Sequence, residues 1–72
     1  MKKIKKIKIK LNGKTKFIDA NTKIDSMING LKIPIKKVAI ELNQEILDKK
    51  KLKKIKLRNY DKIEIVHFIG GG

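Results

Sequence analysis

The sequence has no cysteine, one proline, three aromatic residues and a single histidine, His67. Without cysteine it can form no disulfide, thiolate metal site or cysteine nucleophile, and a reducing compartment is the natural expectation. One imidazole without a second ligand nearby does not make a metal site. The chain has no apolar run long enough to span a bilayer and no signal-like segment after Met1. We therefore expect a soluble cytoplasmic protein without a metal or a membrane partner.

Seventy-two residues suffice for one small domain, which we assign to residues 1–72. A core of this size leaves few residues for a buried catalytic pocket. Ser26 falls within a helical pattern with no base near it in sequence. The carboxylates are scattered, and no pair is spaced for general acid–base catalysis. They are Asp19, Asp25, Glu41, Glu45, Asp48, Asp61 and Glu64. We expect no enzyme, no catalytic residue and no bound cofactor, and a monomer.

The formal net charge is +13, and lysine supplies all but one of the 20 basic residues, Arg58 being the exception. Lysine, isoleucine and asparagine share A/T-rich codons, so a biased genome can produce this excess. Proteins that bind nucleic acid usually offer arginine forks or aromatic platforms. Here Phe17, Tyr60 and Phe68 are scattered along the sequence rather than interleaved with the charge. A solvated lysine surface is favoured, and a basic nucleic-acid-binding mini-domain stays as an alternative.

Two strands joined by a tight turn are predicted at the start of the chain. Residues 5–11 alternate, with Ile7, Ile9 and Leu11 on one side and lysines on the other, as in a half-buried strand. Asn12-Gly13 is a strong signal for a type I′ hairpin turn. The chain then returns through residues 14–19.

A short helix follows, because the apolar period changes from two to 3.6. Ile24, Met27, Ile28 and Leu31 fall at i, i+3, i+4 and i+7. Thr22 and Asp25 resemble a capping box, Gly30 suits the helix exit, and Pro34 prevents continuation.

The remaining pattern predicts a strand, a short edge strand and a final strand. Val38, Ile40 and Leu42 alternate with polar or small residues, Asn43-Gln44 forms a turn, and Ile46-Leu47 follow as the edge. Residues 49–56 read as a lysine-rich loop or single helical turn, anchored by Leu52, Ile55 and Leu57. That loop is a solvated surface or, as an alternative, steers acidic partners. After a turn at residues 59–61, the last strand spans residues 62 to about 68.

This order predicts an α+β, ubiquitin-like β-grasp fold with a mixed four- to five-stranded sheet and one helix covering one face. Ile63 and Ile65 join the helix stripe and the third strand in the core. A flexible glycine tail at residues 69–72 should follow. Val66 and Phe68 fall on the opposite side of the last strand, where with Ala39 they would form an apolar patch beside the tail.

The sequence resembles the thiamine sulfur carrier family (ThiS) over nearly all of the chain after Lys5. The residues that carry the resemblance are Val-Ala-Ile-Glu-Leu-Asn at 38–43, Glu45-Ile46, and the closing strand that runs directly into Gly70-Gly71-Gly72. Gln44 and Tyr60 depart from it, since they stand where the family usually places glycine in tight turns.

The resemblance implies a carrier whose Gly72 carboxylate an activating enzyme (ThiF-like) adenylates with ATP and Mg²⁺. A sulfur donor, a cysteine desulfurase or a persulfide, would then convert the adenylate to a thiocarboxylate. An acceptor such as thiazole synthase (ThiG-like) would take the sulfur for thiamine thiazole synthesis. Gly70 and Gly71 would thread the tail into the partner, and Val66, Phe68 and Ile69 would form the docking surface. Alternatives with the same fold are a ubiquitin-like protein modifier and a carrier for molybdopterin or tRNA thiolation.

Overall fold

The computed structural model describes residues 5–67, so residues 1–4 and 68–72 lie outside it. The predicted tail at 69–72, and with it Phe68, Ile69, Gly70, Gly71 and Gly72, therefore falls outside the described residues. In chain order the elements are strands β1 (Lys6–Leu11) and β2 (Lys14–Asp19), helix α1 (Ile24–Gly30), 3₁₀ helix η1 (Ile35–Lys37), strands β3 (Val38–Leu42) and β4 (Glu45–Ile46), 3₁₀ helix η2 (Lys49–Lys54) and strand β5 (Lys62–His67).

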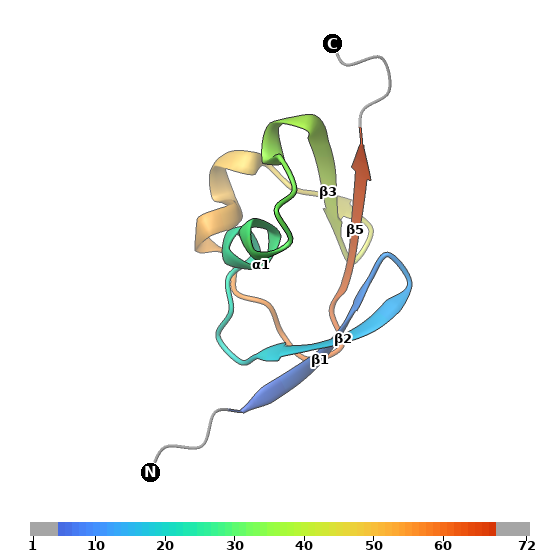
Figure 1. Ribbon diagram of the computed structural model, residues 1–72, viewed down its shortest axis with the longest axis vertical. Coiled ribbons are helices and arrows are strands. Elements are labelled where there is room, and N and C mark those ends of the chain that lie inside the picture. Colours follow the sequence, from blue (N-terminus) through green and yellow to red (C-terminus); the bar gives the residue numbers. More distant parts are fainter. Residues whose placement is uncertain (1–4, 68–72) are drawn as a thin grey trace.

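The five strands form one mixed sheet in the order β2-β1-β5-β3-β4. The last strand in sequence, β5, lies in the middle, parallel to β1 and antiparallel to β3. In Figure 1, α1 and η2 lie together on one side of β3 and β5, while β1 and β2 cross the lower end of the molecule. This is the predicted β-grasp arrangement, with the short edge strand and the lysine-rich helical turn both present.

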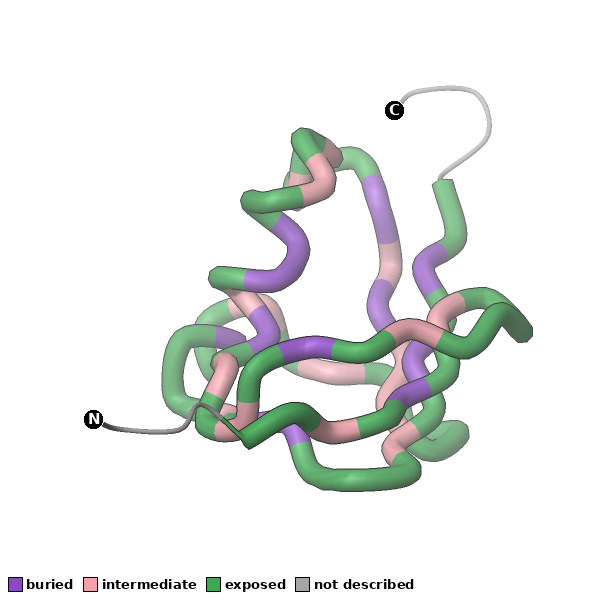
Figure 2. Tube along the Cα trace, turned by 60° about the horizontal axis from the view of Figure 1, so that its bottom comes forward, coloured by how far each residue is buried: buried purple, intermediate pink, exposed green. Residues whose placement is uncertain are grey.

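The core lies between the sheet and the helical side. Its buried side chains are Ile9, Ile18, Ile24, Met27, Ile28, Val38, Ile40, Leu52, Leu57, Ile63 and Ile65. Figure 2 shows that buried positions alternate with more exposed ones along the strands, which is the period of two read from the sequence. Three of the four residues in the predicted helix stripe are fully buried, and Leu31 is half-buried.

The opening hairpin has the predicted turn. Leu11 pairs with Lys14, and the two residues between them, Asn12 and Gly13, have φ values of 49° and 82°. A type I′ turn requires positive φ at both central positions, so asparagine and glycine suit it. The Asn12 side chain also reaches β5, where its Oδ1 accepts from the Ile65 N–H at 2.7 Å and its Nδ2 donates to the Ile65 carbonyl at 3.3 Å.

The helix N-terminus differs from the prediction. The N-cap is Lys23, without a side-chain cap, and the Thr22 hydroxyl donates instead to the Asp19 carbonyl. The Asp25 carboxylate accepts from the N–H of Ser26, so the expected capping box does not form. The reason is that residues 22–24 pair with the segment after η2: the Leu57 N–H donates to the Thr22 carbonyl, and the Ile24 N–H to the Ile55 carbonyl.

The helix ends at Gly30, the exit that the sequence suggested. Leu31 follows as the C-cap, and Lys32, not the glycine, has the positive φ of 60°.

Candidate functional site

The strand that leads to the predicted thiocarboxylate site is held on both sides. β5 pairs with β1 at its start and with β3 along its length, up to the pair His67–Val38. In Figure 1, β5 runs away from β1 and β2 toward the far end of the molecule. Gly70, Gly71 and Gly72 lie outside the described residues, so the structure defines the base of the tail and not the tail itself.

Val66 faces away from the helical side of the sheet, as strand parity predicts. Its side chain is 51% exposed, whereas Ile63 and Ile65 are buried. Val66 pairs across the strands with Ala39. Both residues therefore lie on the open face next to the last described position of β5. Phe68 and Ile69, the other two residues of the predicted docking surface, are outside the described range.

The same open face carries an apolar residue that the sequence reading did not assign to it. Ile46 on β4 is 74% exposed and pairs with Glu41. Glu41 lies two residues from Ala39 along β3, so Ile46, Ala39 and Val66 share one face. We call this set the β3–β4–β5 patch. Only the pairing of β4 with β3 reveals it, because Ile46 alone read as an ordinary edge-strand residue.

Two carboxylates also meet on this patch. Glu41 and Glu64 are direct cross-strand partners, and within residues 5–67 neither carboxylate makes a hydrogen bond or an ion pair. Like charges opposite each other destabilise a sheet slightly. The pair sits on an open face, and of the two only Glu64 lines a hollow, a small one of about 220 Å³ shared with Lys10, Gly13, Lys62 and Ile63, which does not suit general acid–base catalysis by two carboxylates. The pairing of Glu41 with Glu64 can be predicted only when the register between β3 and β5 is known.

His67 is exposed at the end of β5. Among the described residues, no group of three histidine, aspartate or glutamate side chains is placed to hold a metal ion. Within the same part of the chain, neither length nor hydropathy would allow any helix to cross a membrane.

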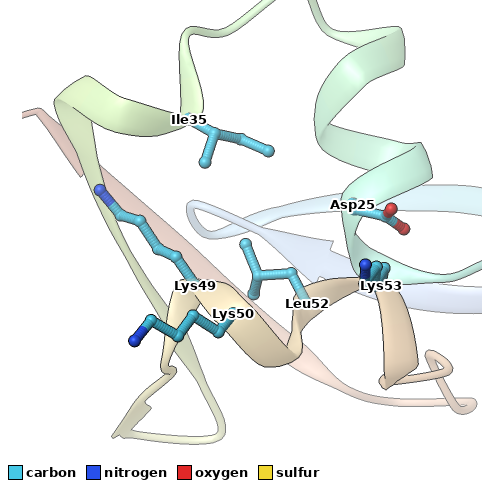
Figure 3. Close-up of a pocket in the computed structure, with 6 residues that line it drawn as sticks. All are labelled: Asp25, Ile35, Lys49, Lys50, Leu52 and Lys53. Atoms are coloured by element: carbon cyan, nitrogen blue, oxygen red, sulfur yellow. The ribbon is translucent and has the colours of Figure 1, made fainter.

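The lysine-rich segment forms η2, with Leu52 only 2% exposed and the lysines around it at the surface. A hollow of about 340 Å³ lies between η2, α1 and η1. Figure 3 shows Asp25 on α1 beside Lys53 on η2, and Lys49 and Lys50 at the outer side. Its lining combines several flexible lysines with one carboxylate and no nucleophile, which suits a charged surface better than a catalytic centre.

These features describe a small rigid body with an open apolar patch at the base of its C-terminal segment. A further hollow, of about 690 Å³, is lined by Leu42, Asn43, Lys54, Ile55, Lys56, Arg58 and Asp61 and holds one carboxylate and no nucleophile. Such a body can present a chain end to another protein, and the chemistry of that end then depends on the partner.

A family model, a related sequence and a solved structure all point to the same family. The model of the ThiS family matches residues 9–72. The chain is 37% identical to the sulfur carrier protein ThiS of Bacillus subtilis over 65 residues, which cover 89% of this chain and 98% of that protein. The crystal structure of the thiamine biosynthesis protein ThiS from Geobacter metallireducens superposes with a TM-score of 0.80 at 28% identity, covering 92% of this chain and all of that one.

Two longer proteins contain a similar segment. The chain is 38% identical over 66 residues to a thiazole synthase of Magnetococcus marinus and 35% identical over 66 residues to one of Paramagnetospirillum magneticum. The match covers 92% of this chain but only 20% of each of those proteins, so the chain spans about a fifth of their length.

Proposed function

Because the chain belongs to the ThiS family, we propose that it carries sulfur for thiamine biosynthesis as a thiocarboxylate on Gly72. The observation that carries the proposal is the family match, which extends from the first strand through the glycine tail to residue 72. A ThiS protein is a small sulfur carrier and not a catalyst, so this chain is not an enzyme.

The proposed chemistry requires a partner that activates the tail. A free terminal carboxylate is ionised at neutral pH and is a poor electrophile. Attack of this carboxylate on the α-phosphorus of Mg²⁺-bound ATP would release pyrophosphate and form an acyl adenylate on Gly72. The outer sulfur of a persulfide, such as one formed on a cysteine desulfurase, would then displace AMP and form an acyl disulfide on Gly72. A thiol of the donor or the activating enzyme would attack the inner sulfur of that S–S bond, which releases the thiocarboxylate and leaves a disulfide on the partner. ATP and Mg²⁺ bind to the activating enzyme in this scheme, and the carrier itself needs no cofactor.

The acceptor that we propose is a thiazole synthase, in the cytoplasm. The two relatives named thiazole synthase each contain a segment similar to this chain within a protein about five times as long. A protein that includes a domain similar to a separate carrier brings the two activities together in one chain. We therefore expect the separate carrier to deliver its sulfur to a separate synthase.

Docking is proposed for the β3–β4–β5 patch, extended by Phe68 and Ile69. Val66 and Ile46 are exposed apolar residues on the face that leads to the tail, and such patches commonly mark interaction sites. The unpaired carboxylates of Glu41 and Glu64 lie between them. A partner that covers this patch should therefore supply a basic side chain opposite the two carboxylates.

The tail chemistry can be tested by the intact mass of the protein purified from its own cells. The expected product carries one sulfur in place of one oxygen at Gly72. Branched conjugates to lysines of other proteins would instead support the ubiquitin-like modifier. A mass that corresponds to a chain continuing beyond Gly72 would contradict the proposal.

Replacing Gly71 with alanine tests why the tail is glycine. We expect slower thiocarboxylation by the activating enzyme with an unchanged denaturation midpoint, because a Cβ restricts the φ and ψ values needed to enter a narrow channel. Single-turnover formation of the thiocarboxylate measures the effect. A Gly71→Ala protein that is converted at the parent rate would exclude this role.

A Val66→Asp substitution tests the docking patch. We expect at least a tenfold loss of affinity for the activating enzyme, measured by calorimetry, because a third carboxylate joins Glu41 and Glu64 and the apolar contact is lost. Thr15→Asp is the matched control, since Thr15 is exposed on β2, away from the patch. Equal binding by both variants and the parent would refute docking at this patch.

A further inference from the structure

The part of the open sheet face formed by β2, β1 and the start of β5 is chemically unlike the β3–β4–β5 patch. Two of the three aromatic residues lie here, and both are largely exposed: Phe17 at 66% and Tyr60 at 74%. Lys8, Lys10 and Lys62 are exposed beside them. We call these five residues the aromatic–lysine face.

The backbone pairing places a lysine between the two aromatic residues. Lys8 on β1 pairs directly with Phe17 on β2, so their side chains share a face. On the other side of β1, the Tyr60 N–H donates to the Lys8 carbonyl at 2.6 Å, and the Lys8 N–H donates to the Asn59 side chain at 2.8 Å. Lys8 therefore lies between Phe17 on β2 and the backbone of Tyr60, and Lys10 pairs with Lys62 at the start of β5.

A hollow of about 190 Å³ lies beside Tyr60 and the three lysines, without Phe17. It is lined by Tyr60, Lys8, Lys10, Lys62 and Ile9 and contains no acidic residue. The adjacent Asp61 carboxylate is turned to other partners, because it accepts from the Arg58 N–H at 2.8 Å and from the Asn43 amide at 3.0 Å. Asp61 therefore does not neutralise the face, and the carboxylate that adjoins it is Glu64, which lines a neighbouring hollow with Lys10 and Lys62.

Tyr60 also occupies its position at a conformational cost. Its φ is 71°, in the left-handed region that glycine adopts freely and that a bulky side chain adopts with strain. Burial does not offset this strain, because three quarters of the side chain is exposed. Residues held in sparsely populated backbone regions cluster at functional sites, and five other non-glycine residues within 5–67 share a positive φ. This observation is independent of the charge of the face.

From this arrangement we propose that the aromatic–lysine face binds single-stranded nucleic acid. The flat sides of Phe17 and Tyr60 offer stacking surfaces for bases, and the three lysines lie where the phosphates of the same strand would pass. An acidic protein surface would match the lysines but would leave the two exposed aromatic side chains unexplained. The bases of a duplex are already paired and stacked, so a duplex could use only the lysines.

This site would act independently of the sulfur chemistry. Tyr60 precedes the start of β5, whereas the tail follows its end at His67. The length of the strand separates the two, so nucleic acid on the face leaves the base of the tail accessible.

Fluorescence anisotropy of the full chain with labelled oligo(U) and with a duplex of equal phosphate number tests the proposal. We expect at least tenfold tighter binding of the single strand at physiological salt. Phe17→Ser and Tyr60→Gly should each weaken it by about fivefold or more, the effect of losing one stacked base. Glycine suits the backbone at residue 60, so Tyr60→Gly should not lower the denaturation midpoint, which separates loss of binding from loss of folding.

A matched pair of triple variants distinguishes the site from general charge. Lys8→Gln/Lys10→Gln/Lys62→Gln removes three charges from the face, and Lys50→Gln/Lys51→Gln/Lys53→Gln removes three exposed charges from η2. The first should weaken oligo(U) binding several-fold more than the second. Equal losses, equal affinity for the duplex, or full binding by Tyr60→Gly would overturn the proposal. If Tyr60→Gly slowed thiocarboxylation and left oligo(U) binding intact, the face would be a protein interface instead.

Discussion

Three asparagine side chains form hydrogen bonds to the backbone of another segment at places where strands begin or end. Asn12 bridges the first turn to β5 through both atoms of its amide. Asn43 does the same at the second turn, accepting from the Lys62 N–H at 2.9 Å and donating to Asp61. Asn59 caps the N–H of Lys8. In each case a side chain satisfies backbone groups that the strand pairing leaves open.

Replacing Asn12 with alanine should lower the free energy of unfolding by about 2 kcal/mol, because two hydrogen bonds to Ile65 are lost and alanine is strained at a φ of 49°. Urea denaturation followed by circular dichroism measures this change. Asn29→Ala is the control, since Asn29 is exposed on α1, and its effect should stay within about 0.5 kcal/mol. Similar effects for the two variants would mean that the bridge to β5 contributes little.

The sequence predicted the role of Asn12 in the hairpin turn but not its hydrogen bonds to β5. The Asn-Gly turn is predictable because its geometry depends on two adjacent residues. The hydrogen bonds to Ile65 join positions 53 apart and depend on β5 lying next to β1, which no local pattern encodes. Tyr60 is similar: its turn was predicted, but its hydrogen bond to the Lys8 carbonyl joins segments far apart in the sequence and follows only from the fold.

The 3₁₀ helix η2 is attached to the core through one buried side chain, Leu52. It consists of five lysines and Leu52, which is buried against α1 and the rest of the core. The sequence predicted a surface loop or single helical turn with three apolar anchors, because Leu52, Ile55 and Leu57 stand out among lysines. It could not predict that the segment after η2 would pair with residues 22–24 and so replace the helix cap expected from Thr22 and Asp25.

Leu52→Ala should therefore cost about 2–5 kcal/mol, the usual range for removing a fully buried leucine. Chemical denaturation quantifies the loss. Lys51→Ala in the same turn should change stability by no more than about 0.5 kcal/mol, because Lys51 is exposed. If Leu52→Ala cost less than about 1 kcal/mol, η2 would be a detachable loop and not part of the core.

For the whole molecule, the dominant physical quantity is a net charge of +13 on 72 residues. Self-repulsion of this kind opposes the compact state and is screened by salt. The exposed pair Lys6–Asp19 offsets little of it, because ion pairs in water are weak. Composition predicted this property fully, since it requires no knowledge of the fold. The division of the open sheet face into a lysine-rich and a carboxylate-bearing part required the structure.

Raising sodium chloride from about 20 to about 200 mM should raise the melting temperature by a few degrees, because the Debye length shortens and repulsion falls. Differential scanning calorimetry measures the shift. The triple η2 variant, Lys50→Gln/Lys51→Gln/Lys53→Gln, should melt higher at low salt and respond less to added salt. A melting temperature that falls with salt would show that attractive pairs dominate.

The central place of β5 has a consequence for synthesis. The ribosome makes residues 6–46 with four of the five strands, yet β1–β2 and β3–β4 cannot form one sheet until residues 62–67 emerge between them. Folding must therefore wait until almost the whole domain has left the exit tunnel, and a nascent chain interrupted before residue 62 has no native core to complete.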